Sequence, residues 1–111
     1  MIPGTDNMMN NMLGEAALLP GGFHSWTPNE RMFSLMTPTI VSKDNQAEIV
    51  TGTGGAGRIP GAILQVLDKL IYHNMSIYDA VHAPRMHVVG DKINAEPGFV
   101  GNTTSLGLKF D

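Results

Sequence analysis

The stretch Glu48-Ile-Val-Thr-Gly-Thr-Gly-Gly-Ala-Gly-Arg-Ile-Pro60 decides how this chain folds. It starts as a short apolar strand, continues as a glycine-rich loop and ends where a long helix begins. The glycines leave bare backbone for a ligand to approach, and the helix start adds unpaired N–H groups and a partial positive charge. The loop is therefore predicted to bind an anion, or an oxygen that becomes anionic during a reaction.

Before the loop, the sequence predicts a β-hairpin. Residues 32–43 are rich in apolar and β-branched side chains, a turn signal follows at residues 43–46, and residues 47–51 form the second strand. Pro38 removes one ladder donor, so we expect its strand to lie at an edge or to carry a bulge there.

After the loop, apolar side chains recur at the spacing of one helical face, and Pro60 suits the first turn of that helix. The members of this face are Ile59, Ile63, Val66, Leu67, Leu70 and Ile71. A second helix is predicted from Ser76, the N-cap, with Asp79 at the capping-box position, to Pro84, which stops it. Strands over 86–89 and 92–96, joined by a turn, complete a mixed α/β unit.

Composition narrows the class of protein. The chain has 111 residues, of which 42% are hydrophobic and 15% charged, enough apolar material for one domain or a piece of a larger one. A formal net charge of -3 provides no basic field for nucleic acid. The chain has no cysteine, which excludes disulfides and thiolate metal sites, and no apolar run long enough to span a bilayer. Nothing in the sequence indicates a compartment.

For the remaining polar side chains, we predict structural roles rather than functional ones. His73, His82 and His87 lack metal-ligand spacing, so no metal is expected, and no cofactor either. Arg85 is expected to make structural hydrogen bonds or an ion pair, with Asp79 as a candidate partner.

The glycine loop admits four interpretations. The run from Gly52 to Gly57 fits a dinucleotide-binding pattern, but the acidic residue expected about 20 positions later is missing. A Walker A loop would need a lysine in place of Arg58 and a hydroxyl-bearing residue in place of Ile59. The glycines could also serve only a tight passage from strand to helix. Finally, backbone N–H groups near Gly55 and Ala56 could form an oxyanion hole.

Several sequence blocks, in this order, resemble the small subunit of gamma-glutamyltransferases over roughly residues 2–99. These blocks are Ile2-Pro-Gly-Thr5, Asn10-Asn-Met-Leu13, Ser34-Leu-Met-Thr-Pro-Thr-Ile-Val41, the glycine loop with Arg58-Ile59, Ala80-Val-His-Ala-Pro-Arg85, His87 and Glu96-Pro-Gly-Phe99. The resemblance implies an N-terminal-nucleophile hydrolase fold, here a partial αββα sandwich with a mixed sheet and two covering helices. On this basis residues 1–111 are one partial domain, with 102–111 a poorly matched tail.

The resemblance also implies a reaction. A threonine attacks the gamma-glutamyl amide of glutathione or a related compound, and the acyl group passes to water, an amino acid or a peptide. The oxyanion-hole glycines of the family map to Gly55 and Ala56, and alanine still offers a backbone N–H. A serine pair that contacts the glutamyl carboxylate maps to Ser34 and Leu35, so one hydroxyl is lost.

The acidic residue that takes the substrate ammonium in this family aligns with Gly14, and Glu15 beside it is the nearby substitute. The family's nucleophile lies upstream of Ile2, and the closing strands after residue 99 are missing or replaced by the tail. We therefore expect a fragment, inactive alone, that needs the nucleophile-bearing segment and the large subunit; oligomerisation stays open. The alternatives are a non-catalytic binding or regulatory remnant that pairs with a complete homologue, and a nucleotide-binding module.

Overall fold

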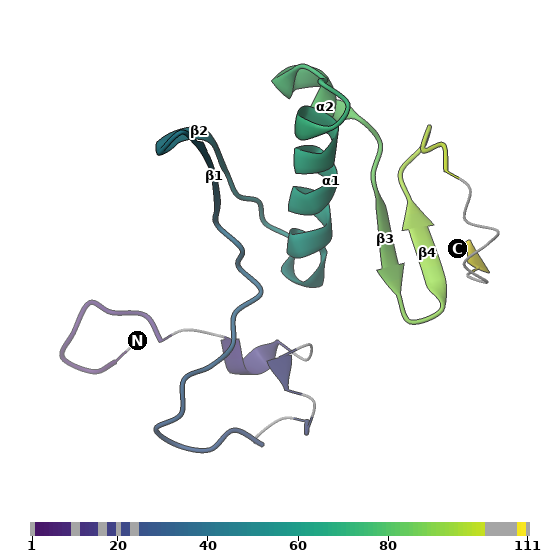
Figure 1. The fold of residues 1–111 in the computed structure, drawn as a ribbon. Coiled ribbons are helices and arrows are strands. Elements are labelled where there is room, and N and C mark those ends of the chain that lie inside the picture. Colours follow the sequence, from purple (N-terminus) through teal and green to yellow (C-terminus); the bar gives the residue numbers. More distant parts are fainter. Residues whose placement is uncertain are drawn as a thin grey trace. The chain divides into compact units, whose positions relative to one another are not determined.

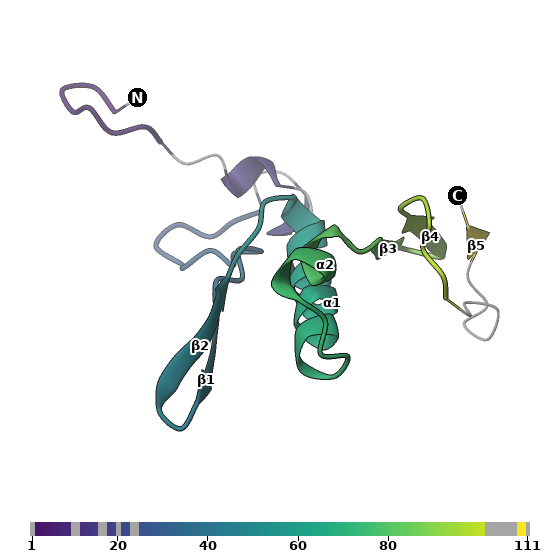
Figure 2. The ribbon, with the colours of Figure 1, turned by 90° about the horizontal axis from the view of Figure 1, so that it is seen from above.

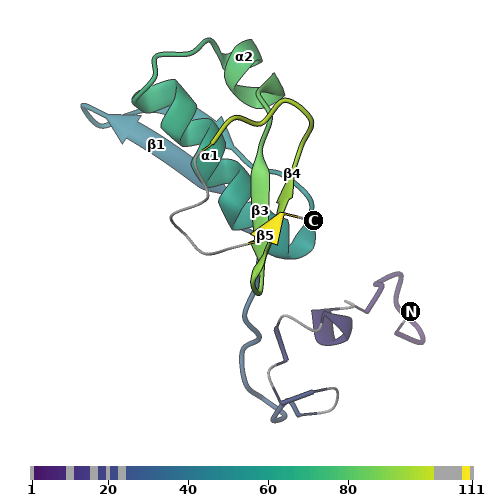
Figure 3. The same ribbon diagram turned by 90° about the vertical axis from the view of Figure 1, so that its right-hand side faces the viewer.

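The computed structural model describes residues 2–9, 12–15, 18–19, 21–22, 25–101 and 109–110. These residues belong to two compact units, 1–35 and 36–111, and each unit is described by itself (Figures 1, 2 and 3). Within the described residues, no helix combines the length and apolarity that crossing a membrane would require. The predicted tail, 102–111, lies outside the described residues except for 109–110.

The first unit has little regular structure in its described part. A short 3-10 helix, η1, covers Met12–Gly14. Leu18 and Leu19 are buried. The indole of Trp26 meets the Phe33 ring edge-on, with 6.3 Å between the ring centroids. These apolar contacts hold the unit together locally.

The second unit begins with a hairpin of β1 (Thr39–Lys43) and β2 (Gln46–Thr51), as predicted. Asp44 and Asn45 both have positive φ, 51° and 62°, as a type I′ hairpin turn requires. The first strand is shorter than predicted, because residues 32–38 are not in a strand and β1 begins directly after Pro38. Proline cannot donate to the ladder, so pairing starts beyond it. The bulge lies between Val41 and Ser42 instead.

Helix α1 (Ile59–Ile71) follows the glycine loop, with Pro60 in its first turn as predicted. The predicted apolar face is correct at its start, where Ile59 and Ile63 are buried. It is wrong at its end, because Ile71 is 47% exposed. The last turn of α1 therefore contributes little to the core.

Helix α2 (Ile77–His82) has the predicted cap. The Ser76 hydroxyl accepts from the Asp79 backbone N–H at 3.0 Å and donates to the Asp79 carboxylate at 2.6 Å. Ala80 is fully buried, and the helix stops before Pro84. Both ends of this helix were therefore readable from sequence.

The second sheet contains β3 (Met86–Val89), β4 (Lys92–Ala95) and β5 (Lys109–Phe110). Strands β3 and β4 pair antiparallel, and β5 pairs parallel to β4. Ile93 on β4 is fully buried, which anchors the sheet. The described residues thus form a partial α/β fold with two small sheets.

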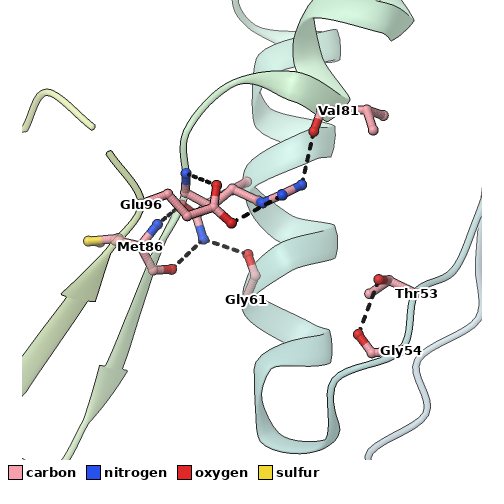
Figure 4. A network of polar contacts seen from close by, with 8 residues as sticks. Thr53, Gly54, Gly61, Val81, Met86 and Glu96 are labelled. Atoms are coloured by element: carbon pink, nitrogen blue, oxygen red, sulfur yellow. Dashed lines mark hydrogen bonds and ion pairs between the residues drawn. The ribbon is translucent and has the colours of Figure 1, made fainter. Parts of the chain in front are cut away.

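The side-chain amide of Gln65 links α1 to β3 (Figure 4). Its Nε2 donates to the carbonyl oxygens of Gly61 and Met86, each at 2.9 Å, and its Oε1 accepts from the Met86 N–H at 3.0 Å. The Gln65 amide thus pairs with both the N–H and the carbonyl of Met86, as the backbone of a neighbouring strand would. Since both residues are half-buried, this link fixes β3 against the helix.

We predict that Gln65→Ala speeds hydrogen exchange at the Met86 amide by about tenfold or more. The substitution removes the acceptor of that N–H, and an unpaired, partly buried donor costs about 1 to 3 kcal/mol. Gln46→Ala, at the exposed start of β2, is the matched control and should leave exchange at Met86 unchanged. Equal exchange rates in the parent and Gln65→Ala would contradict the structural role of the amide.

Candidate active site

The glycine loop has an unusual backbone conformation at two consecutive residues. Gly55 has φ 129° and ψ 21°, and Ala56 follows with φ 49°. A 3-10 turn, η3 (Ala56–Arg58), then leads into α1, with the Arg58 N–H donating to the Gly55 carbonyl at 3.0 Å. The conformation of Gly55 suits glycine alone, whereas Ala56 holds a left-handed conformation that costs alanine about 1 to 2 kcal/mol.

This conformation leaves backbone donors available. Among the described residues, the N–H groups of Gly54, Gly55 and Ala56 have no hydrogen-bond acceptor. The loop side chain Thr53 turns back on its own segment, and its hydroxyl donates to the Gly54 carbonyl at 3.2 Å (Figure 4). The loop is exposed, so these donors can serve a ligand.

A cavity of about 570 Å³ lies beside the loop. Its walls come from the loop, the first half of α1, and the β3–β4 hairpin with the residues that follow it. The lining residues that carry the argument below are Gly54, Gly55, Arg58, Arg85, His87, Asn94 and Glu96. Ala56 adjoins this group in sequence but does not line the cavity.

Arg85, just before β3, and Glu96, just after β4, form one wall of the cavity and are hydrogen-bonded to each other. The Arg85 backbone N–H and guanidinium donate to the two carboxylate oxygens of Glu96, at 3.0 and 3.2 Å, and Nη1 also donates to the Val81 carbonyl at 2.9 Å (Figure 4). The expected ion pair of Arg85 is therefore present, but the suggested partner Asp79 was wrong. Asp79 instead caps α2, where Ser76 holds its carboxylate.

The pKa of Glu96 lies below its ordinary value. Burial raises this pKa, but the hydrogen bonds from the backbone and side chain of Arg85, together with the charges of Arg85 and Lys69, lower it by more. Glu96 is therefore ionised at neutral pH and neutralises the charge of Arg85.

The predicted substrate-binding residues fall in the first unit. Gly14 ends η1, and the Glu15 N–H donates to the Met12 carbonyl at 3.0 Å. Ser34 and Leu35 lie in a stretch without strand or helix, with Ser34 exposed and Leu35 half-buried. The structure thus brings Gly55 and Ala56 together in one loop of the second unit, and places the two substrate pairs in the first unit.

The sequence reasoning missed two features of the cavity: the hydrogen bonds between Gln65 and Met86, and the pairing of His87 with Asn94. His87 and Asn94 are register partners on β3 and β4. The two-residue turn Gly90-Asp91 was predicted, and counting outward from it would have paired these two residues. No group of three His, Asp or Glu side chains placed to hold a metal ion is found among the described residues.

We predict that Ala56→Gly raises the free energy of unfolding by about 1 kcal/mol, because glycine adopts positive φ without the steric cost that alanine has. Ala62→Gly is the matched control, since Ala62 lies inside α1, where the same exchange should lower stability by about 1 kcal/mol. Urea unfolding of both variants measures whether the two changes in the free energy of unfolding have opposite signs. Destabilisation by Ala56→Gly would contradict the left-handed assignment.

We also predict that Glu96 contributes stability that depends on pH. Because its pKa is lowered in the folded chain, this contribution is complete above the ordinary glutamate pKa of about 4.3 and is lost as the pH falls through the folded value. A carbon-detected NMR titration of the Glu96 carboxyl should show a midpoint below about 4.3, and Arg85→Gln should raise it. A midpoint that Arg85→Gln leaves unmoved would exclude the proposed cause.

Comparison with known proteins gives the family of this chain. The family model described as Gamma-glutamyltranspeptidase matches residues 3–109. The glutathione hydrolase proenzyme of Escherichia coli (strain K12) is 34% identical over 106 residues, which cover 94% of this chain and 17% of that protein. The acylase ACY 1 proenzyme of Pseudomonas sp. (strain SE83) is 36% identical over 95 residues, covering 86% of this chain and 17% of that protein.

Solved structures agree with these sequence matches. A mutant gamma-glutamyltranspeptidase of Helicobacter pylori superposes with a TM-score of 0.69 at 35% identity, over 78% of this chain and 50% of that chain. The 111 residues thus span about one sixth of the length of the curated relatives named above. The match over nearly the whole chain shows that this protein belongs to the gamma-glutamyltranspeptidase family.

Proposed function

We propose that this chain carries the oxyanion hole of a gamma-glutamyl transfer reaction. One observation supports this most directly: consecutive backbone N–H groups, from Gly54 to Ala56, have no acceptor among the described residues. Such donors stabilise negative charge on the carbonyl oxygen of a tetrahedral intermediate, and each is worth about 10² to 10³ in kcat. Membership of the gamma-glutamyltranspeptidase family supplies the matching chemistry.

In the proposed reaction, a threonine hydroxyl oxygen attacks the carbonyl carbon of a gamma-glutamyl amide. A C–O bond forms as the threonine's own amine takes the hydroxyl proton, and the carbonyl oxygen becomes an oxyanion at the loop. Collapse then breaks the C–N bond, and the leaving amine takes that proton. Water or an amine then attacks the resulting ester, and the proton it loses returns to the threonine oxygen. The loop stabilises the oxyanion in both halves of the reaction.

The nucleophile and the large subunit are proposed to come from outside these 111 residues. The chain spans 17% of the Escherichia coli relative, so most of such a protein lies beyond the matched part. We propose that Ser34, Leu35, Gly14 and Glu15 contribute to the glutamyl pocket. A hydroxyl lost at Leu35 would cost about 1 to 3 kcal/mol for a free glutamyl carboxylate and would shift the preferred acyl donor.

A chimera tests this proposal, with residues 2–99 replacing the matched segment of the Escherichia coli relative. We expect the chimera to release nitroaniline from gamma-glutamyl 4-nitroanilide, whereas the 111-residue chain alone releases none. In the chimera, Gly55→Ala should lower kcat by about tenfold or more, because alanine cannot hold φ 129° without strain and the N–H groups shift.

Gly61→Ala is the matched control, because a Cβ at Gly61 meets no atom and the residue lies within α1. Its kcat should match that of the unsubstituted chimera. A folded chimera without activity would favour the non-catalytic remnant. Hydrolysis by the 111-residue chain alone would contradict the need for an outside nucleophile.

A further inference from the structure

The first unit has a cavity of its own, with a volume of about 470 Å³. Its base is apolar, because the buried side chains of Leu18 and Leu19 line it. Trp26 and Phe33 line it as well, and we call it the aromatic cavity. No residue that we propose above for the oxyanion hole or the glutamyl pocket lines this cavity. Its volume is within the range of small-molecule sites, so it has room for a small organic ligand.

A tight turn brings the indole of Trp26 next to Glu30. The Glu30 N–H donates to the Thr27 carbonyl at 3.4 Å, and Asn29 between them has φ 67°. Proline at the second position of the turn and positive φ at the third are the features of a type II turn. The indole Nε1 of Trp26 then donates to the Glu30 carbonyl at 3.3 Å. The ring of Trp26 is thus held beside the residue that supplies the acidic side chain of the cavity.

Trp26 and Phe33 line the aromatic cavity with their rings at nearly a right angle. The ring planes are inclined by 86°, with 6.3 Å between the ring centroids. Phe33 is 73% exposed, and a large apolar side chain exposed beside a cavity is typical of a binding surface. The face of an aromatic ring attracts a cation that lies within about 6 Å of the ring centroid. Two rings in this arrangement can therefore contact one cation together.

Glu30 gives the aromatic cavity a negative charge. Its side chain is exposed, and no ion pair between Glu30 and a described cationic side chain is found. The whole chain has a formal net charge of -3, which also favours a cation over an anion. An alkylated ammonium ion suits this combination, because its alkyl groups can pack on the rings and on the apolar base while its charge stays near the carboxylate.

We infer that the aromatic cavity is a binding site for a small quaternary ammonium ion. Trp26 and Phe33 contact the methyl groups of the ligand, and the Glu30 carboxylate offsets its charge. A primary ammonium ion binds more weakly, because its three N–H groups bind water and do not pack on aromatic rings. This inference does not depend on the proposed acyl transfer, since the two rest on different residues.

The fluorescence of Trp26 measures this binding directly, because Trp26 is the only tryptophan of the chain. We expect choline chloride, exchanged for sodium chloride at constant ionic strength, to cause a saturable change in the emission of the 111-residue chain and to shift the NMR signal of the indole N–H. Dimethylbutanol, in which an uncharged carbon atom replaces the choline nitrogen, should bind about tenfold more weakly, because it keeps the shape but loses the charge. Ethanolamine, which carries a primary ammonium, should also bind more weakly than choline.

Two substitutions with matched controls test the residues. Phe33→Leu should weaken choline binding by about fivefold, because it removes one ring and keeps an apolar side chain. Tyr72→Leu removes a ring that is 77% exposed after α1, outside the cavity, and should leave binding unchanged. Glu30→Gln should weaken binding by about threefold, as expected for an exposed ion pair. Glu48→Gln makes the same charge change at an exposed position of β2 and should have no effect.

Equal affinity for choline and dimethylbutanol would overturn the inference, as would equal weakening by a substitution and its control. A choline titration that changes neither the emission nor the NMR signal of Trp26 would overturn it too. If Phe33→Leu does not fold, the three ligands compared on the parent chain still decide. An inactive chimera would contradict the proposed function and leave this inference intact.

Discussion

The site depends on the double hydrogen bond between the Gln65 amide and the backbone of Met86. Helix α1 bears the glycine loop at its N-terminus, and β3 begins the hairpin that forms the opposite cavity wall. A side-chain amide can satisfy both backbone groups of a strand residue, so the link fixes the distance between helix and strand. Without this link, the two walls of the cavity would not be held at a fixed distance from each other.

The glycine loop must make a tight turn, and the backbone conformation that allows this turn lowers the stability of the loop. A sharp passage from β2 to α1 needs positive φ at Gly55 and Ala56, and the same conformation leaves successive N–H groups without an acceptor in the described part of the chain. Alanine at the second position makes the loop less stable than glycine would. The left-handed conformation of Ala56 is a cost to folding, and a bound oxyanion would use the donors that this conformation leaves available.

The apolar surface of the second unit is consistent with a partial fold. In the β1–β2 hairpin, Ile40 and Val50 face each other on one side and are exposed, while Val41 and Ile49 form a half-buried pair on the other. A strand that is apolar on both faces is typical of a sheet covered by two layers. The chain's partial coverage of its family relatives agrees with this pattern.

By itself, the sequence determined the family, the place of the hairpin turn, the Ser76 cap and the helix after the glycine loop, because these depend on local patterns of few residues. The tertiary structure decided which carboxylate pairs with Arg85 and how far the apolar face of α1 is buried. It also placed Gln65 against Met86 and His87 with Asn94 in the cavity. Contacts between residues far apart in sequence depend on packing, which local patterns do not encode.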